Sequence, residues 1–474
     1  MTTVRLGPFN RVEGDLEVTL TLDAAGFVTR AQVNSPLFRG FERILQGRAP
    51  LDALTIVPRI CGICSVAQSM AAAQALADWA RIKPVPNGAL VAQTVLAVEN
   101  LADHLTHFFL FFMPDFTHSA YRTMPWYEAA VRRFAPYRGE SAARWLAARA
   151  QWFHLVGLLA GRWPHTLAVQ PSGTTRTIHA MEQRELLRMV GQMRRYLTES
   201  LFGDTLDAVL ALDSADALLA WAEGRESDAA FFIQVAHALE LFTVGRAYDR
   251  FLSYGAYRAW PAGVWDRATA ATAPLDEAAI VEEVAASWLG GSASHPAEGE
   301  TVPWLERPDA YSWCKAPRYH GAPAETGALA RAVVAGVPLA RDLVQRWGGS
   351  LFSRVIARLW ECARIVQWVE AWLKEIDVKA SFIEPVVWPN EGRGVGLVEA
   401  ARGALGHWLE VANGRIQRYQ IIAPTTWNFS PRDQTGQPGP LEKALEGLTA
   451  GAGAMPFVHH VVRSFDPCMV CTVH

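Results

Sequence analysis

The sequence lacks the features that mark several broad classes of protein. Its 474 residues carry a formal net charge of −3, so no excess of positive charge indicates a nucleic-acid partner or an anionic membrane surface. No window contains the roughly 18 apolar residues that a transmembrane helix needs. No signal peptide, internal repeat or low-complexity linker is visible. From these absences we expect a soluble, cytoplasmic chain that does not bind nucleic acid and does not insert into a membrane.

Cysteine is also scarce, because the chain contains six residues of this type, too few for a secreted disulfide scaffold. Four of the six form two C-x-x-C pairs near opposite ends of the chain, a spacing typical of intracellular metal or redox chemistry. The other two stand alone and are expected to be small core residues. The paired cysteines are Cys61, Cys64, Cys468 and Cys471, and the isolated ones are Cys314 and Cys362.

Hydrophobic residues, by contrast, make up 50% of the chain, enough for a large core. Alternating polarity predicts two strands within residues 4–35 and a hairpin around Asn-Gly within 404–423. Helical periodicity predominates between them, and loops are expected at 161–173, 288–323 and 387–396. The predicted helices cover 38–50, a segment after the first C-x-x-C pair, 87–113, 140–160, 178–202, 227–255, 325–345 and 349–377. We therefore predict an α+β fold, mainly α: one compact domain over residues 1–474, with a central bundle of long helices and small β-sheets near the N-terminus and in the C-terminal region.

The two thiol pairs suit a metal ion. Cys61 and Cys64 precede a predicted helix, whose N-terminal dipole favours their thiolate forms. Four sulfurs favour a soft or borderline metal such as nickel, zinc, copper or iron. Spacing alone leaves three interpretations open: a buried catalytic metal, a structural zinc ion, or two unrelated thiol pairs.

Several longer motifs narrow this choice. The segments "RICGIC" and "DPCMVCTVH" are accompanied by "FNRVEGDL", "FRGFERIL", "YSWCKAPRY", "ARGALGHW" and "PTTWNFSPRD". In this order and over essentially the whole chain, they resemble the large subunit of nickel–iron hydrogenases. The resemblance implies heterolytic cleavage of H2 to protons and electrons.

The resemblance also implies a set of metal ligands. Cys61 and Cys468 correspond to terminal ligands of nickel, and Cys64 and Cys471 to sulfurs that bridge nickel and iron. The iron of the family carries two cyanides and one carbon monoxide. Bound between nickel and a terminal sulfur base, H2 can split into hydride and proton.

Five further residues match positions with roles in the family. Glu13 resembles the proton gate beside a terminal cysteine, and a partly buried carboxyl of raised pKa suits that role. Arg402 resembles the arginine over the open side of the metals, oriented by Asp103 and Asp466. Thr425 resembles the residue whose hydroxyl binds a cyanide.

The family also implies a magnesium ion, bound by Glu42 and by the terminal His474, which would hold the C-terminus in place. His104, His107 and His165 are expected to be structural residues near the site. Because no iron–sulfur cluster motif remains after the four nickel thiols, we expect a small iron–sulfur subunit as partner, in a heterodimer or a dimer of heterodimers.

Three substitutions and the end of the sequence resemble the regulatory, hydrogen-sensing branch of the family. Gln68 stands where catalytic relatives usually carry His, and Ile63 and Phe111 are bulkier than the common Val and Leu along the gas route. The sequence stops at His474, as in branch members without a C-terminal extension. A sensor would signal to a partner such as a histidine kinase. The alternatives are an energy-conserving uptake hydrogenase and, in another class, a scaffold subunit that has lost its metal.

Overall fold

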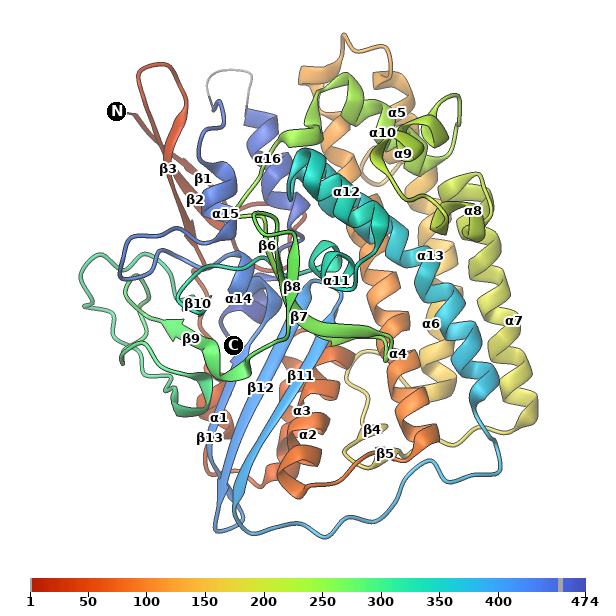
Figure 1. Ribbon diagram of the computed structural model, residues 1–474, viewed down its shortest axis with the longest axis vertical. Coiled ribbons are helices and arrows are strands. Elements are labelled where there is room, and N and C mark those ends of the chain that lie inside the picture. Colours follow the sequence, from red (N-terminus) through yellow and green to blue (C-terminus); the bar gives the residue numbers. More distant parts are fainter. Residues whose placement is uncertain (1, 451–454) are drawn as a thin grey trace.

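Long helices pack into a bundle that forms one flank of the molecule (Figure 1). The computed structural model describes residues 2–450 and 455–474. Neighbouring helices of the bundle pack in the order α4–α6–α7–α13 and back to α4. Their bounds are Pro86–Thr106 for α4, Glu140–Ala160 for α6, Ala180–Tyr196 for α7 and Leu351–Glu375 for α13. This arrangement confirms the predicted helical bundle.

The local sequence explains where these helices begin. Pro86 opens α4, where its missing N–H leaves no helical hydrogen bond unmade. Ser350 precedes α13, and its hydroxyl accepts a hydrogen bond of 3.2 Å from the N–H of Ser353. Both helices are buried along most of their length, and their charged residues in the interior, such as Glu99 on α4 and Glu361 on α13, have polar partners there.

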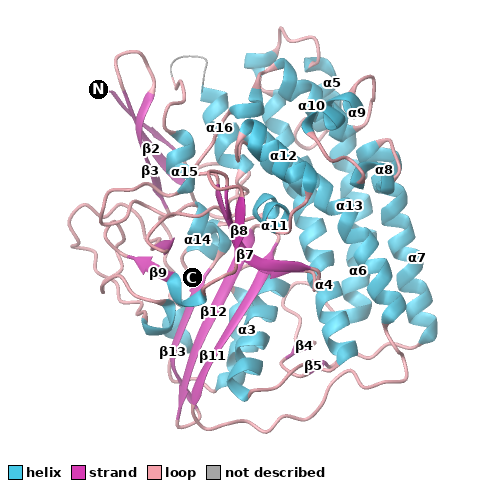
Figure 2. Cartoon of the chain, viewed as in Figure 1, coloured by secondary structure: helices cyan, strands magenta, loops and turns pink. Residues whose placement is uncertain are grey.

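A three-stranded antiparallel sheet, β11–β12–β13, lies beside the bundle (Figure 2). Helix α3, Ser65–Ala80, packs directly on strand β11. The contact depends on glycine, since a Cβ atom on Gly394 would lie 2.1 Å from the carbonyl oxygen of Ala75, and one on Gly396 2.0 Å from that of Ala71. The backbones of helix and strand therefore touch, which fixes the start of α3, where Cys64 is the N-cap residue.

The two ends of the chain share a smaller core. Strands β1, β2 and β3 form an antiparallel sheet in sequence order. The buried faces of these strands pack with residues of α15 and α16 near the C-terminus. The C-terminus itself lies in the interior of the molecule, beside α14 and the end of the large sheet (Figure 1). The predicted small sheets near both ends are thus confirmed.

The remaining elements complete the fold. The strands are β1 Thr2–Leu6, β2 Glu17–Leu22, β3 Val28–Asn34, β4 Val169–Gln170, β5 Gly173–Thr174, β6 Arg250–Ala256, β7 Trp260–Asp266, β8 Ala271–Ala273, β9 Ile280–Glu283, β10 Ala316–Tyr319, β11 Gly392–Ala400, β12 Gly403–Ala412 and β13 Arg415–Ile422. The shorter helices are α1 Phe41–Leu45, α2 Ala53–Ile56, α5 Tyr127–Phe134, α8 Leu206–Leu210, α9 Ala215–Ala222, α10 Asp228–Ala238, α11 Ala328–Val334, α12 Pro338–Trp347, α14 Pro424–Asn428, α15 Pro440–Leu445, α16 Met455–Ser464 and α17 Met469–Thr472. A π-helical turn, His107–Phe112, extends α4.

Several predicted boundaries are wrong. The helix expected over 227–255 ends at Ala238, and β6 follows, because pairing with β7 decides the conformation of that segment. The helix expected over 325–345 is divided into α11 and α12 at Gly336, whose φ is +81°. The loop expected over 387–396 already contains the start of β11, whose glycines pack on α3. Within 38–50 only α1 is an α-helix. The single domain over 1–474 stays a prediction.

In the part of the chain that the structure describes, no helix combines the length and the apolar character needed to span a membrane.

Candidate metal centre

Four sulfur atoms converge in the interior of the protein. The Sγ atom of Cys61 lies 3.5 Å from that of Cys468, and the Sγ atom of Cys64 lies 3.2 Å from that of Cys471. The Sγ atoms of Cys468 and Cys471 are 3.0 Å apart. All four side chains are buried, form no disulfide, and place their sulfurs within 4.8 Å of one another. The structure thus brings together the two thiol pairs that the sequence singled out.

The backbone around each pair explains this convergence. The N–H of Ile63 points at the Sγ atom of Cys61 at 3.3 Å. The second pair is held by the N-terminal segment, because Met469 donates its N–H to the carbonyl of Glu13 at 2.7 Å and Glu13 donates to the carbonyl of Pro467 at 3.3 Å. The two ends of the chain therefore form one backbone-bonded unit around the sulfurs.

The donor set fits a soft metal ion. A metal–sulfur bond of about 2.3 Å allows sulfurs that share an ion to lie up to about 4.6 Å apart, close to the observed spread. Hydrogen bonds from Cys468, Cys471 and Cys64 hold the pKa of Cys61 well below its usual range. Burial instead raises the pKa of Cys468 and of Cys471. Four thiolates at these distances require a cation to compensate their charge, as nickel and iron would.

Glu13 lies beside the sulfurs. Its backbone pairs with Cys468 in a parallel β-bridge. Burial raises the pKa of its carboxyl, the charge of Cys61 adds to the rise, and Arg402 and Arg39 oppose it. The side chain is half-buried, so its carboxyl is neither enclosed by the core nor fully exposed.

Arg402 is held in the interior by two carboxylates. Its Nη1 lies 2.8 Å from Oδ2 of Asp103, and its Nη2 lies 3.1 Å from Oδ1 of Asp466. Its Nε also donates to the carbonyl of Asp466 at 2.9 Å. Burial raises the pKa of Asp103 to about 7, against the charge of Arg402. Burial acts the same way on Asp466, but Arg402, His107 and Arg358 together outweigh it, so the pKa of Asp466 falls below its usual range.

Thr425 lies on the other side of Cys468. Its hydroxyl accepts a hydrogen bond of 3.2 Å from the N–H of Cys468, and the side chain is buried at the start of α14. The structure thus places it beside a cysteine of the site, as the motif predicts.

The C-terminal residue is buried. His474 places Nε2 3.2 Å from Oε1 of Glu42, while its Nδ1 lies 3.0 Å from the carbonyl oxygen of Cys471. Glu42 also accepts from the N–H of Ile421 at 2.8 Å and from the hydroxyl of Thr301. Burial raises the pKa of Glu42, but Lys315 and His474 outweigh it and lower the value to about 2.

Lys315 is a functional candidate that our sequence analysis did not single out. Its ammonium donates to Oε1 of Gln420 at 2.7 Å and to Oε2 of Glu282 at 3.2 Å. Lys315 and Glu282 line a cavity of about 20 Å³ together with Glu42 and His474. The signal in the sequence was a lysine between the apolar neighbours Cys314 and Ala316 in the motif "YSWCKAPRY".

Glu99 is a second candidate that was missed. Its carboxylate accepts hydrogen bonds of 3.0 Å from the N–H groups of Val66 and Ala67, at the start of α3, and one of 2.8 Å from Nε1 of Trp163. Burial raises the pKa of this carboxyl to about 8. The Glu99 side chain stabilises the start of α3, beside Cys64. The signal in the sequence that could have identified Glu99 was a charged residue among the apolar residues of α4.

The three histidines expected to be structural are each engaged by protein groups. Nε2 of His104 lies 3.1 Å from Glu361, and Nε2 of His107 lies 2.6 Å from the carbonyl oxygen of Arg463. Nδ1 of His165 lies 2.9 Å from the carbonyl oxygen of Pro58. These contacts fit a structural role.

The residues that resemble the sensing branch occupy different surroundings. Gln68 is buried in α3, with its Oε1 2.9 Å from Nε2 of His407. Ile63 is partly buried against the core beside Cys61. Phe111 is partly exposed in the π-helical turn, where its carbonyl accepts from Arg11 at 3.1 Å.

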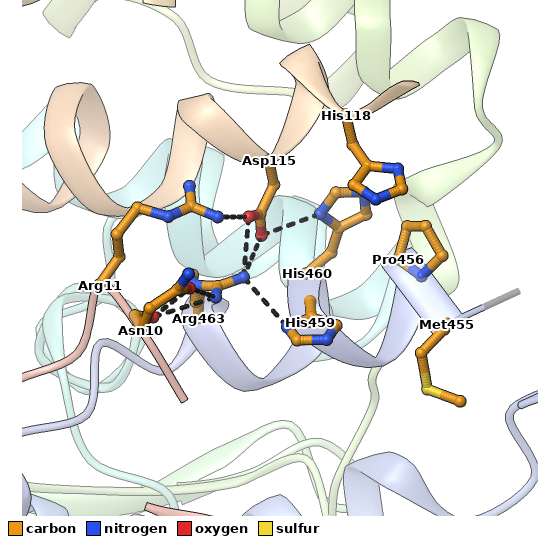
Figure 3. A pocket seen from close by; sticks show the side chains of 9 residues that line it. All are labelled: Asn10, Arg11, Asp115, His118, Met455, Pro456, His459, His460 and Arg463. Carbon is orange, nitrogen blue, oxygen red and sulfur yellow. Dashed lines mark hydrogen bonds and ion pairs between the residues drawn. The ribbon is translucent and has the colours of Figure 1, made fainter. Parts of the chain in front are cut away.

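A larger cavity of about 260 Å³ lies beside α16 (Figure 3). Asp115 lies between two arginines there: Arg463 donates to both of its carboxylate oxygens at 2.7 Å, and Arg11 to one of them. Arg463 also donates to the side-chain oxygen of Asn10 at 2.7 Å. This ion cluster anchors the N-terminal segment that carries Glu13.

The pattern that defines nickel-dependent hydrogenases matches residues 39–124 and 142–474 of this chain. The large subunit of a periplasmic NiFeSe hydrogenase from Desulfomicrobium baculatum is 28% identical, over 99% of this chain and 94% of its own length. The uptake hydrogenase large subunit of Rubrivivax gelatinosus is 24% identical, over 98% of this chain and 94% of its own length.

Among solved structures, a NiFeSe hydrogenase of Dm. baculatum superimposes with a TM-score of 0.86 at 27% identity, and the match covers 100% of both chains. The predicted α+β fold, mainly α, is therefore that of the hydrogenase large subunit. Because the family pattern spans most of the sequence and includes both thiol pairs, this chain belongs to the nickel-dependent hydrogenases, oxidoreductases that act on H2 and bind nickel and iron.

Proposed function

We propose that the four sulfurs hold a nickel–iron centre, with Cys61 and Cys468 as terminal ligands of nickel and Cys64 and Cys471 bridging to iron. The observation that carries this proposal is the convergence of four buried sulfurs within 4.8 Å. When bound, such a centre supplies the heterolytic cleavage of H2.

The surrounding side chains would orient the iron and its two cyanides and one carbon monoxide. Nη1 of Arg402 has no hydrogen bond of normal geometry within the described residues, although it lies in an ion pair with Asp103. It therefore retains capacity to donate to a cyanide, while Asp103 and Asp466 fix the plane of the guanidinium group. The oxygen of the Thr425 hydroxyl accepts a hydrogen bond from the N–H of Cys468, so the hydrogen of this hydroxyl stays free to be donated.

Glu13 would receive the proton from a terminal sulfur. Its raised pKa keeps the protonated form accessible nearer to neutral pH, and its half-buried position gives it access to both the cluster and the surface. Proton transfer through Glu13 thus needs no opening of the core.

Glu42 and His474 would bind a magnesium ion. The lowered pKa of Glu42 keeps its carboxylate ionised, and hard oxygen ligands of this kind are those that magnesium prefers. The adjoining cavity of about 20 Å³ has room for a water molecule. Lys315 and Glu282, which line it, would hydrogen-bond to water bound there.

Electrons need a path that this chain does not supply. The two cysteines outside the centre, Cys314 and Cys362, are buried and unpaired, and burial raises the pKa of each thiol. A small subunit with iron–sulfur clusters would therefore complete a heterodimer or a dimer of heterodimers. The cytoplasmic location stays a prediction; one relative is named as periplasmic.

We also propose a hydrogen-sensing role, in which the heterodimer signals to a partner such as a histidine kinase. The sensing role is supported by the altered residues Ile63, Phe111 and Gln68. Ile63 and Phe111 are bulkier than the usual residues and would narrow the route by which O2 reaches the metals. Uptake of H2 for energy is the second candidate, because several relatives are named uptake hydrogenases.

Infrared spectroscopy and metal analysis of the purified protein test these proposals. We expect nickel and iron together with cyanide and carbonyl bands, and a spectrum under H2 that survives exposure to air. Absence of nickel would contradict the centre. If Ile63 and Phe111 narrow the gas route, an Ile63→Val/Phe111→Leu variant should lose the H2-reduced state faster in air. An unchanged rate of loss would contradict the sensor argument.

A further inference from the structure

Arg39 touches the backbone of both cysteine loops. Its Nη2 donates to the carbonyl of Ile60 and to the carbonyl of Val470, each at 2.5 Å. Ile60 immediately precedes Cys61, and Val470 immediately precedes Cys471. One guanidinium nitrogen therefore joins the two peptides that carry a cysteine from each end of the chain.

The base of this side chain is firmly held. Gly40, with φ of +73°, turns the chain directly into α1, where Glu42 is buried among its partners Ile421 and His474. The guanidinium carbon of Arg39 lies 4.9 Å from the centre of the Phe41 ring, a cation–π contact that orients it. The two donated hydrogen bonds and the ring contact therefore orient the exposed Arg39 side chain between the loops.

We propose that Arg39 is a positioning residue for the metal centre: it clamps the two cysteine loops at a set separation. The inference rests on the proposed nickel–iron centre and extends it to a residue outside the ligand set. Metal–sulfur bonds join the loops through side chains alone, and the Arg39 contacts join them through the backbone. Because hydrogen bonds from a charged donor are stronger than neutral ones, the two that this nitrogen donates resist relative movement of the loops.

The main competing role is electrostatic. The positive charge of Arg39 also lowers the pKa of Glu13, so a substitution could act through charge alone. Exposed charges are screened by salt, whereas a backbone clamp is not. Comparing the effect at low and at high ionic strength therefore separates the two roles.

The test uses the purified heterodimer with its metals. Because Arg39 is exposed, Arg39→Met removes the two hydrogen bonds without leaving an unpaired charge in the core. Arg43→Met is the matched control, since Arg43 is exposed on α1 four residues further on. Infrared bands, the nickel electron paramagnetic resonance spectrum, kcat and KM for H2 are measured for each.

We expect Arg39→Met to shift the infrared bands and the nickel spectrum and to lower kcat by about 10- to 100-fold, as small misplacements of reacting groups do, with KM changed less than kcat. The effect should persist at high salt, and Arg43→Met should behave like the unsubstituted protein. Unchanged spectra, an effect that disappears at high salt, or activity lost only through dissociation of the small subunit would each overturn the inference. If the unsubstituted protein itself lacked nickel and the bands, the proposed function would fail instead.

Discussion

Replacing Arg331 with methionine should both destabilise the protein and misplace Arg402. Arg331 is fully buried on α11 and donates to Glu361 at 2.8 and 3.1 Å and to Glu399 at 2.9 Å. It also donates to the carbonyls of Ala400 and Ala401 at 2.7 and 3.1 Å. These carbonyls lie in the turn that leads directly to Arg402.

The size of the effect follows from the buried carboxylates. Burial alone raises the pKa of Glu361, but Arg331 and His104 outweigh it and lower the value from 4.5 to about 2. A difference of this size corresponds to about 3 kcal/mol, and breaking a buried ion pair by removing one partner typically costs about 3–5 kcal/mol. We expect Arg331→Met to lower the free energy of unfolding by about 3–5 kcal/mol at neutral pH.

The pH dependence has a definite sign. Because the pKa of Glu361 is lower in the folded protein than in the unfolded chain, its stabilising contribution is complete above about pH 4.5 and is lost as the pH falls through about 2. Arg331→Met should remove this contribution, so the variant should unfold at a higher pH during acid titration. Urea unfolding at several pH values measures both effects.

A double variant provides the control. In Arg331→Met/Glu361→Gln a neutral amide replaces the carboxylate of this pair, so part of the lost stability should return. H2 oxidation should stay low, because the carbonyls next to Arg402 still lack their donor. A loss below about 1 kcal/mol in the single variant, or full activity in either variant, would contradict this reasoning.

Substitutions at four further positions test other parts of the structure. Glu13→Gln should retain nickel yet lower kcat by about 10²–10⁴-fold, with partial recovery in Glu13→Asp, as steady-state assays of H2 oxidation would reveal. His474→Ala should reduce bound magnesium, measured by metal analysis, and lower the thermal midpoint, because it removes the contact with Glu42. Gly396→Ala should destabilise by about 1–3 kcal/mol, since its Cβ would lie 2.0 Å from a carbonyl oxygen of α3. Gly191→Ala, on the exposed face of α7 with open space around it, should instead stabilise by about 0.5–1 kcal/mol in the same unfolding assay.

The sequence predicted that the two thiol pairs could share a metal, and they do meet, whereas it placed several element boundaries wrongly. The C-x-x-C pairs were recognisable from their residue type and spacing alone, whereas Arg402 and Glu42 were singled out through the resemblance to family motifs, and their roles stay predictions. Strand β6 was missed because its conformation depends on pairing with β7, which no local window contains. Lys315 and Glu99 were missed because their partners lie far away in the sequence.

By itself, the sequence determined the chemistry available to this protein: four thiols in two pairs, the carboxyls of Glu13 and Glu42, the imidazole of His474, and helical periodicity for a long-helix bundle. Only the tertiary structure decided that the thiols meet within 4.8 Å, that Arg402 lies between two aspartates, and that Arg39 bridges both cysteine loops. The physical reason is that residue type and periodicity are local properties, whereas a metal centre depends on distances between segments brought together by packing of the whole chain.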